Sequence, residues 1–378
     1  MKVVLWLQDS RSLHGAERAT LQLAGGLDAA GVAVRVLLMR ETRMGEGPRP
    51  LAEALRAVVP VEEIPVRGRV SRPAVMRLRE YMAAERADIL HSTGYKADWH
   101  AGMASRGGSL FPVVSTVHGW LFRRDFKERF FQALNIRTLR RFSRVIVLSR
   151  FYEAYLRRRG FTPLQLARIP TGMESERIVR REEALRLWET AESVFTFGFL
   201  GRLSEEKDPG LLLRASARLA RDLRNSPRPW RLLVAGEGPM RRHLERRIRW
   251  MGLSECVTLA GRMEPDDFFR QVHVLAQCSR VENQPMSVME AMAWMRPVLA
   301  TRAGGLPELV RSGETGWVIP RRSARKLAGA MKECLMAPDR AREAGRRGRE
   351  WLARDFSFKT MVEDHIGMYA ACLPPKRG

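Results

Sequence analysis

Two cations stand close together in one short loop of the sequence. Residues 201–210 read GRLSEEKDPG and follow VFTFGFL, an apolar run typical of a buried strand. A surface turn would explain Gly201 and Pro209, but it would not need both Arg202 and Lys207. Arginine offers a planar fork of donors and lysine a mobile point charge, so the pair suits two neighbouring phosphates, as in a diphosphate. A loop held by salt bridges is the alternative interpretation.

A second stretch, SRVENQPMSVMEAMAWMRPV, combines a helix start with two acids. Pro285 is suited to opening a helix, whose amides at Ser287 and Val288 would face a ligand with the positive end of the helix dipole behind them. Glu282 and Glu290 flank this start, with seven residues between them. Because carboxylates repel phosphates and accept hydrogen bonds from hydroxyls, a sugar and a ribose are their natural partners. Taken singly, Glu290 is equally a helix-dipole acid and Glu282 a solvated loop residue.

Other residues with potential chemistry give weaker signals. His118 follows the apolar run PVVSTV and precedes Trp120, so it could cap the next helix or pack against the indole ring. It lacks the neighbouring base and acid that a nucleophile requires. The cysteines show neither a CxxC pair nor a zinc pattern, and we expect them to be reduced and mostly structural. We therefore expect no metal site and no cofactor. The cysteines are Cys256, Cys278, Cys334 and Cys372.

The order of the predicted elements explains why these residues follow strands. Short β-rich runs alternate with helical patterns, and the alternation restarts at residue 194 after a polar stretch, residues 171–193, that we interpret as irregular. The chain of 378 residues exceeds the size of one core. We predict an α/β protein with two Rossmann-like, doubly wound domains facing a central cleft, joined near residues 172–192. Ligands bind at the carboxyl ends of the strands in such sheets.

Composition narrows the function classes. The net charge of +24 favours a polyanionic partner, and lipid headgroups and nucleic acid are both polyanionic. The basic excess is spread over both halves of the chain, with no clustered arm or basic-aromatic module, so we expect no nucleic-acid binding. No run approaches the length of a membrane span and the apolar start is too short for a signal peptide. We expect a cytoplasmic protein, with contact at the inner face of the membrane as an open alternative.

The motifs, taken in order, resemble the retaining glycosyltransferases of family four, which have the GT-B fold. GRLSEEK, VAGEGPMRRHLE, LAGRM, the acids Glu282 and Glu290, and GGLPELV carry the resemblance between residues 196 and 320. HGAERATLQLAGGLDAAG, STVHG and RIPTGME resemble the first half of such enzymes. The resemblance implies an N-terminal, acceptor-side domain over residues 1–175, a nucleotide-sugar domain over residues 176–356, and a last helix, residues 357–373, that packs back onto the first domain.

The resemblance also implies a role for each matching residue. Arg202 and Lys207 would hold the donor diphosphate, Glu282 the hydroxyls of the transferred sugar and Glu290 those of the ribose. The predicted catalytic residues are His118, Arg202, Lys207 and Glu282. The predicted donor-binding residues are Gly15, Arg202, Lys207, Met263, Glu282, Met286, Ser287, Val288 and Glu290. Of these, Met263 would meet the base, Gly15 would let the first domain approach the donor, and His118 would lie near the transferred sugar.

The segment from Phe122 to Arg141 bears on the acceptor. Phe122, Phe126 and Phe130 repeat at helical spacing, and the segment from Phe122 to Arg141 holds seven basic and two acidic residues. Such a helix can lie in an anionic headgroup layer. The alternative is a core helix with a solvated basic face. We expect a saccharide or lipid-linked acceptor and a UDP-sugar donor.

Three hypotheses for the function remain. The first is a metal-independent, retaining hexosyltransferase with the substrates just named, a soluble small-molecule or protein acceptor being its alternative. A basic nucleic-acid-binding protein is a remote alternative. A Rossmann-type oxidoreductase is disfavoured because no GxGxxG follows the first strand.

Overall fold

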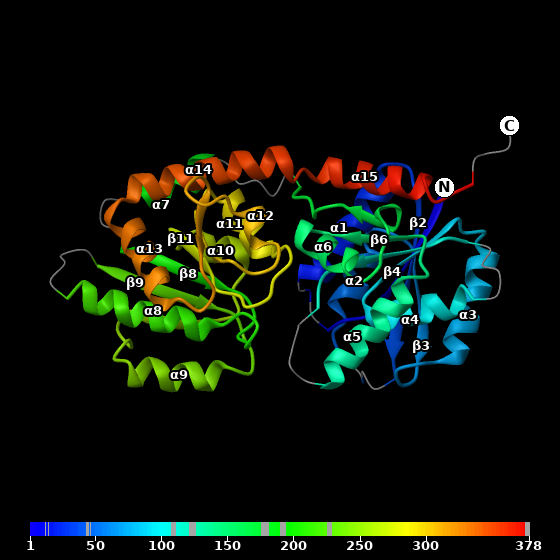
Figure 1. Ribbon diagram of the computed structural model, residues 1–378, viewed down its shortest axis with the longest axis horizontal. Helices are drawn as coiled ribbons and strands as arrows, with labels where there is room; N and C mark the ends of the chain where they lie inside the picture. Colours follow the sequence, from blue (N-terminus) through cyan, green and yellow to red (C-terminus); the bar gives the residue numbers. More distant parts are fainter. Residues whose placement is uncertain are drawn as a thin grey trace. The chain divides into compact units, whose positions relative to one another are not determined.

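The computed structural model describes residues 1–11, 13, 15–42, 45, 47–106, 111–120, 126–174, 181–189, 194–224 and 229–374. The chain divides into two compact units (Figure 1). Unit 1 comprises residues 1–172 and 358–378, and unit 2 comprises residues 173–357. The first division falls after Gly172, close to the boundary expected after residue 175.

Unit 1 is built on a seven-stranded sheet in which every neighbouring pair is parallel. The strand order is β3-β2-β1-β4-β5-β6-β7, so the order reverses between β1 and β4, as in a doubly wound fold. Its strands are β1 (Lys2–Gln8), β2 (Ala33–Glu41), β3 (Val61–Val66), β4 (Ile89–Thr93), β5 (Val113–Val117), β6 (Arg144–Val147) and β7 (Leu166–Arg168). Its helices are α1 (Gly15–Ala29), α2 (Pro50–Arg56), α3 (Arg72–Ala84), α4 (Tyr95–Ala104), α5 (Phe126–Leu139), α6 (Arg150–Arg157), the short 3-10 helix η1 (Pro163–Gln165) and α15 (Phe358–Ala370).

The side chains of this sheet alternate between two buried layers. In β1, Val4 and Trp6 join a core with α3, α4, α5 and α6, while Val3 and Leu5 join a second core with α1, α2 and α15. Because both faces of a parallel sheet are buried, its strands are apolar almost throughout, which is what made them visible in the sequence.

The last helix, α15, belongs to the core of unit 1 although it follows unit 2 in the chain. Tyr369, which is fully buried, places its hydroxyl 2.6 Å from Nδ1 of His91 on β4. The other ring nitrogen, Nε2, lies 2.8 Å from Oγ1 of Thr116 on β5. At Gly26 on α1, a Cβ atom would lie only 2.5 Å from the ring of Phe358, so the two helices approach closely. Together these contacts join α15 to the sheet and to α1.

Unit 2 repeats the plan with a six-stranded parallel sheet of order β10-β9-β8-β11-β12-β13, which reverses between β8 and β11. Its strands are β8 (Phe195–Leu200), β9 (Trp230–Ala235), β10 (Val257–Gly261), β11 (Val274–Gln277), β12 (Val298–Thr301) and β13 (Gly316–Ile319). Its helices are α7 (Arg181–Glu189), α8 (Pro209–Asp222), α9 (Arg241–Trp250), α10 (Pro265–Phe269), α11 (Met286–Ala293), α12 (Leu306–Leu309), α13 (Ala324–Met336) and α14 (Pro338–Asp355). One face of the sheet packs on α8, α9 and α13, and the other on α10, α11, α12 and α14.

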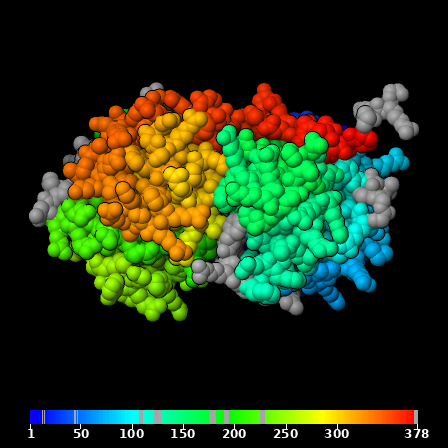
Figure 2. All heavy atoms as spheres, viewed as in Figure 1, coloured from blue at the N-terminus to red at the C-terminus, as the bar shows by residue number. Residues whose placement is uncertain are grey.

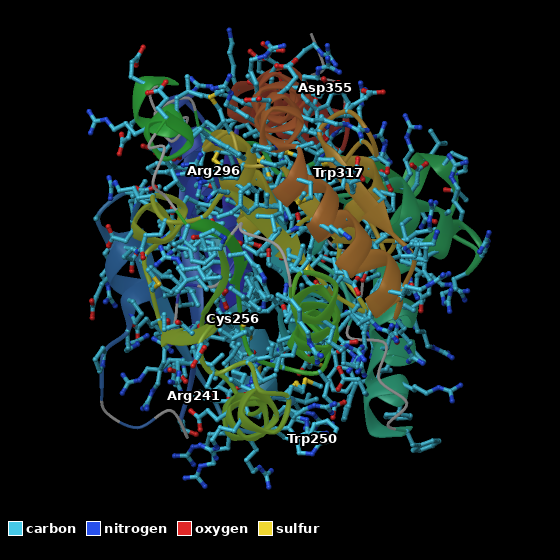
Figure 3. The ribbon with its side chains drawn as sticks, turned by 90° about the vertical axis from the view of Figure 1, so that its left-hand side faces the viewer. Arg241, Trp250, Cys256, Arg296, Trp317 and Asp355 are labelled. Carbon is cyan, nitrogen blue, oxygen red and sulfur yellow. The ribbon has the colours of Figure 1, made fainter. Side chains whose placement is uncertain are left out.

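The helix α7 corrects the expectation that residues 171–193 are irregular. Ala184 is fully buried, and Trp188 packs edge-on against His273, so one face of α7 does reach the core. Arg296, also fully buried and labelled in Figure 3, donates from Nη1 to the carbonyl of Ala184 at 2.8 Å and from Nε and Nη2 to that of Phe269 at 3.2 and 3.1 Å. Burial lowers the pKa of Arg296 to about 9. This helix was not predicted because its many charged residues outnumber the few apolar ones that form its buried face.

No helix in the part of the chain that the structure describes is long and apolar enough to cross a membrane.

Candidate functional site

The loop after β8 carries the two cations predicted from the sequence. Asp208 ends this loop in a left-handed conformation (φ 43°), and its Oδ1 accepts the amide N–H of Leu211 at 3.2 Å, capping α8 at Pro209. Its Oδ2 accepts from Nε of Arg280 at 2.9 Å. Asp208 thus holds the loop after β8 against the loop after β11. Arg202 is exposed, and its guanidinium forms no hydrogen bond or ion pair with any residue that the structure describes.

Lys207 and Glu282 meet directly. Nζ of Lys207 lies 2.5 Å from Oε2 of Glu282. The same oxygen accepts from Nε2 of Gln277 at 3.1 Å and from Oγ of Ser279 at 2.9 Å. Among the described residues, no hydrogen bond reaches Oε1 of Glu282. The carboxylate is therefore oriented by three donors through one oxygen, while the other oxygen is available to a ligand hydroxyl.

This network continues to the start of α11. Oγ of Ser287 donates to Oε1 of Gln277 at 3.3 Å, so the residue that orients Glu282 also contacts the first turn of the helix. Met286 and Ser287 are the first residues of α11, and their N–H groups have no acceptor within it. The N–H of Val288 donates to the carbonyl of Pro285 at 3.1 Å. This amide, which we predicted to face the ligand together with that of Ser287, therefore already has an acceptor within the first turn of α11.

Three glycines allow the loops of this site to approach one another. A Cβ at Gly236 would lie 1.9 Å from the carbonyl oxygen of Gly201, and one at Gly304 would lie 1.7 Å from that of Glu282. Both glycines have positive φ, 134° and 53°. At Gly238 the corresponding contact is 2.4 Å from the carbonyl oxygen of Leu203. The loops that carry Arg202 and Glu282 are thus each held by a neighbour with no side chain.

The remaining predicted donor residues lie around the same strands. Glu290 lies on α11, one turn beyond Met286, and is half-buried. Met263 follows β10 and packs against the core cluster that contains Met286 and Val288. The structure therefore links Lys207, Glu282 and Ser287 by hydrogen bonds, and it leaves Arg202 on the exposed side of its loop.

Unit 1 has its own hollow, of 240 Å³, at the carboxyl ends of β1, β4 and β5. His118 lines it and is kept neutral near pH 7, because burial, with a contribution from His365, lowers its pKa to about 4. Gly15 begins α1, whose first turn contributes Glu17 to the same lining, whereas His14 lies outside the described residues. The rest of the lining was not predicted from the sequence, although the polar run after β4 was a usable signal. Those residues include Lys96, Asp98, Trp120 and Asn135.

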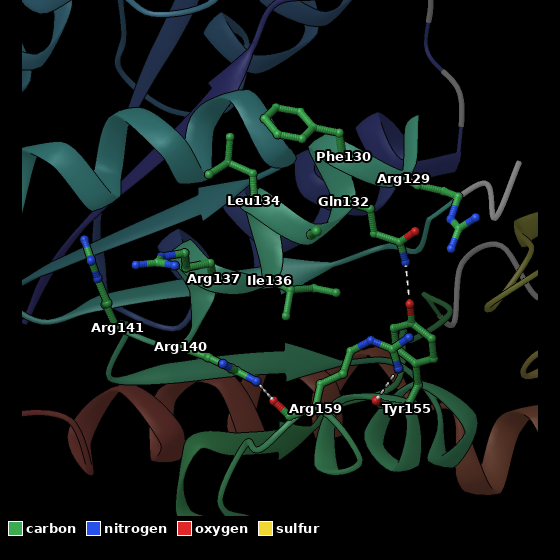
Figure 4. A pocket seen from close by; sticks show the side chains of 11 residues that line it. Arg129, Phe130, Gln132, Leu134, Ile136, Arg137, Arg140, Arg141, Tyr155 and Arg159 are labelled. Carbon is green, nitrogen blue, oxygen red and sulfur yellow. Dashed lines mark hydrogen bonds between the residues drawn. The ribbon is translucent and has the colours of Figure 1, made fainter. Parts of the chain in front are cut away.

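A second, larger hollow of unit 1, of 1080 Å³, lies between α5 and α6 (Figure 4). We call it the arginine groove; Arg129, Arg137, Arg140, Arg141 and Arg159 line it, and none of the described residues that line it is acidic.

Contacts within the arginine groove leave some of its cations free. The guanidinium of Arg159 stacks on the ring of Tyr155 at 3.5 Å, and that of Arg140 donates to the carbonyl of Arg159. Arg129, Arg137 and Arg141 form no hydrogen bond or ion pair with any described residue, so their charges are available to an anionic ligand.

Two of the three phenylalanines of α5 are exposed, and the third, Phe131, is half-buried against Trp99. Phe126 is 83% and Phe130 55% exposed, and α5 lies at the surface in the face shown in Figure 2. Its buried residues are instead Asn135, Ile136 and Leu139. The core-helix alternative is therefore wrong for these two rings, and Phe122 lies outside the described residues.

In the part of the chain that the structure describes, no group of three His, Cys, Asp or Glu side chains is placed to hold a metal ion. The four cysteines are free, and Cys278 and Cys334 are buried.

Comparison with known proteins agrees with this arrangement. Residues 194–337 match the family model described as glycosyl transferases group 1, and residues 13–177 match the one described as glycosyltransferase family 4. The chain belongs to glycosyltransferase family 4. The resemblance predicted from the motifs is confirmed. The stretch 194–337 contains all six strands of the sheet of unit 2, and the stretch 13–177 contains the strands β2 to β7 of unit 1.

Curated relatives of this family 4 glycosyltransferase match over part of their length. It is similar to a D-inositol 3-phosphate glycosyltransferase of Gordonia bronchialis, with 32% identity over 48% of this chain and 41% of that protein. It is also similar to a GDP-mannose-dependent alpha-(1-6)-phosphatidylinositol monomannoside mannosyltransferase of Mycobacterium tuberculosis, with 28% identity over 56% of this chain and 58% of that protein. The chain spans about half the length of these relatives or less.

Solved structures match over nearly the whole chain. The Anabaena protein HepE in complex with UDP and glucose superposes with a TM-score of 0.82 at 20% identity, covering 98% of this chain and 99% of that one. Sucrose-phosphate synthase of Thermosynechococcus elongatus gives a TM-score of 0.79 at 21% identity over the same shares. At such identities the likeness shows the fold alone, and the predicted GT-B fold is confirmed.

Proposed function

We propose that this chain is a retaining, metal-independent glycosyltransferase that moves a sugar from a nucleotide-diphosphate donor, with UDP-sugars favoured, to a lipid-linked or polysaccharide acceptor. The observation that carries the proposal is the network joining Lys207, Glu282 and Ser287 at the carboxyl ends of β8 and β11. It places a cation, an oriented carboxylate and the start of α11 at the point where the strand order of the sheet reverses.

The proposed mechanism assigns charge stabilisation to the protein. Arg202, Lys207 and the amides of Met286 and Ser287 bind the diphosphate and stabilise the charge that develops as the bond from the anomeric carbon to the phosphate oxygen breaks. Oε1 of Glu282 accepts a hydrogen bond from a hydroxyl of the transferred sugar. The acceptor hydroxyl attacks from the side of the leaving group and gives its proton to the departing phosphate oxygen, which retains the anomeric configuration.

The remaining residues recognise the rest of the donor. Glu290 accepts hydrogen bonds from the ribose hydroxyls, and Met263 contacts the base. His118, neutral near pH 7, lies beside the transferred sugar as a hydrogen-bonding partner. The UDP preference is supported by the solved structure of HepE, which holds UDP and glucose. The GDP-mannose dependence named for the mycobacterial relative makes GDP-sugars the competing donor class.

The acceptor end of the proposal rests on unit 1. The arginine groove offers unpaired guanidinium groups, Phe130 lines it, and the exposed Phe126 lies one turn earlier on the same helix. Arginines and exposed aromatic rings together suit an anionic headgroup layer. We place the enzyme in the cytoplasm, at the inner face of the membrane, where a lipid-linked acceptor would be presented. The relative that acts, by its name, on phosphatidylinositol monomannoside supports a lipid-linked acceptor.

A donor screen tests the proposed function. The melting temperature of the chain is measured with UDP-, GDP- and ADP-sugars, since a ligand that binds only the folded form raises it. Slow hydrolysis of the same donors is then followed with Mg²⁺ and with excess EDTA. We expect one class to raise the melting temperature and to be hydrolysed equally under both conditions. Loss of hydrolysis in EDTA would contradict metal independence, and no response to any class would contradict the donor site.

A further inference from the structure

One aromatic ring lines the hollow of unit 1. Trp120 follows the loop of His118 and Gly119 and is half-buried. Its ring packs against Tyr152 and Tyr155, with centroids 5.7 Å apart in both pairs. Its backbone N–H donates to the hydroxyl of Tyr152 at 3.1 Å. The two tyrosines therefore hold the indole in place, and Trp120 also contributes to the lining of the hollow.

The indole N–H of Trp120 ends a buried chain of hydrogen bonds. It donates to Oδ1 of Asn135 at 3.2 Å, and Nδ2 of Asn135 donates to Oδ2 of Asp98 at 2.8 Å. Oδ1 of Asp98 accepts from the hydroxyls of Ser92 at 2.6 Å and Ser115 at 2.7 Å. Because an indole N–H can only donate and an ionised carboxylate can only accept, these neighbours fix the orientation of the Asn135 amide.

Two other indole N–H groups of this chain lack the hydrogen bond that Trp120 has. The Nε1 atoms of Trp6 and Trp188 are buried and have no hydrogen-bond partner. Trp120, which is only half-buried, receives a partner through Asn135 and Asp98, which are 3% and 2% exposed. Burial raises the pKa of Asp98 to about 6, although its three hydrogen-bond donors act in the opposite direction. Keeping this buried carboxylate ionised therefore costs free energy. A purely structural residue linking β4, β5 and α5 would not need to reach the indole.

We propose that Trp120 is the residue on which the ring of the acceptor stacks, and that Asp98, acting through Asn135, is the positioning residue that fixes the indole. The ligand is a pyranose or a cyclitol, whose C–H face packs on an aromatic ring while its hydroxyls meet polar side chains of the hollow. The volume of 240 Å³ is below that of a drug-sized pocket, which suits a single ring. This inference rests on the proposed glycosyl transfer and names the class of acceptor group it uses.

Exchanging the residue types at positions 98 and 135 tests this chain of hydrogen bonds. In Asp98→Asn, the two serine hydroxyls hold the amide oxygen, so the amide nitrogen faces Nδ2 of Asn135; if Asn135 turns, it presents a donor to the indole N–H. In Asn135→Asp, two carboxylates face each other without a donor between them. In the double variant Asp98→Asn/Asn135→Asp, the carboxylate introduced on α5 accepts from both neighbours, and the chain of hydrogen bonds is complete again.

The probe is methyl α-D-glucopyranoside, and its Kd for the full chain is measured by saturation-transfer NMR in the presence of UDP. We expect Trp120→Ala to weaken binding about fivefold to tenfold, with Trp120→Phe intermediate. Each single variant of the relay should weaken binding about fivefold, and the double variant should return to within about twofold of the wild type. Trp250→Ala is the matched control, because Trp250 is 80% exposed at the end of α9 in unit 2 (Figure 3).

Several outcomes would overturn the inference: no saturation transfer to the wild type, an unchanged Kd in Trp120→Ala, or a double variant as weak as the worse single variant. Single variants that lower the melting temperature but leave the Kd unchanged would show that Asp98 is only structural. The rise in melting temperature caused by UDP separates two failures. If it is present and Trp120 has no effect, this inference fails; if it is absent, the proposed donor site fails.

Discussion

The ammonium group of Lys207 lies 2.5 Å from Oε2 of Glu282, 75 residues further along the chain. Their side chains are 23% and 12% exposed, so the pair is partly shielded from water. In the proposed mechanism the two residues bind neighbouring parts of one donor, the diphosphate and the sugar. Their contact orients both before the donor arrives, which reduces the reorganisation that binding would otherwise require.

Removing the ammonium group of Lys207 should lower donor binding and turnover without lowering the stability of the fold. In Lys207→Ala, Glu282 keeps its bonds to Gln277 and Ser279, so we expect the melting temperature without ligand to change little. Turnover should fall by about a hundredfold or more, because one preorganised charge at the leaving group is lost. The rise in melting temperature with UDP should also shrink. Lys332→Ala, an exposed lysine on α13, is the control, and equal losses in both variants would contradict the assignment.

The sequence predicted most of this site because its signals are local. An apolar strand followed by glycine and cations can be recognised from neighbouring residues in the sequence. The doubly wound fold then places Lys207 beside Glu282. The bond from the N–H of Val288 to the carbonyl of Pro285 could not be predicted, since residue types do not determine how tightly the first turn of a helix is wound. The hollow with Trp120 and Asn135 was missed because five separate segments of the chain, between Leu7 and Asn135, form it. Its hydrogen-bond relay depends on side-chain orientation, which no spacing rule supplies.

Because the loops at Gly304 and Glu282 approach closely, adding one methyl group at Gly304 should strongly reduce stability. Gly304→Ala would place Cβ against the carbonyl oxygen of Glu282 at a backbone conformation that alanine disfavours. We expect a loss of more than about 2 kcal/mol in the free energy of unfolding of unit 2, together with weaker donor binding. Gly329→Ala, within α13 and with no atom near its Cβ, should instead be stabilising by about 0.5–1 kcal/mol. Urea unfolding of both variants checks the contrast, and similar losses would contradict it.

The buried histidine of unit 2 predicts how stability depends on pH. Nδ1 of His273 accepts the N–H of Thr196 at 3.0 Å, and burial, with Arg296 nearby, lowers the pKa of His273 to about 4. The unfolded chain takes up this proton near pH 6.5, but the folded unit does not. This contribution to stability is therefore complete above pH 6.5 and is lost as the pH falls towards 4, by about 1.4 kcal/mol per pH unit.

Substitution isolates that contribution. His273→Gln keeps a polar group near Thr196 but cannot be protonated, so its free energy of unfolding should fall less steeply than that of the wild type between pH 6.5 and 4.5. Urea unfolding, followed with a probe in unit 2, measures both slopes. His243→Gln, an exposed histidine on α9, should leave the slope unchanged. Parallel curves for wild type and His273→Gln would show that His273 does not stay neutral in the folded unit.

The arginine groove predicts membrane binding that depends on where charge is removed, and not only on how much. Arg137→Glu/Arg141→Glu reverses two unpaired cations of the groove, and we expect binding to phosphatidylglycerol vesicles to weaken by about tenfold or more at moderate salt. Arg242→Glu/Arg246→Glu on α9 changes the net charge by the same amount at two exposed arginines of unit 2, and it should bind nearly as well as the wild type.

Co-sedimentation with phosphatidylglycerol and with phosphatidylcholine vesicles measures both double variants beside Phe126→Ser/Phe130→Ser, which removes the exposed rings. The ring variant should weaken binding to the anionic vesicles while the charge of the groove is kept, because inserted aromatic side chains add apolar burial to the attraction between charges. Equal losses in the groove and α9 variants would mean that the overall charge of +24 attracts the chain to the vesicles without a defined site. No binding of the wild type would remove the membrane from the proposal and leave a soluble acceptor.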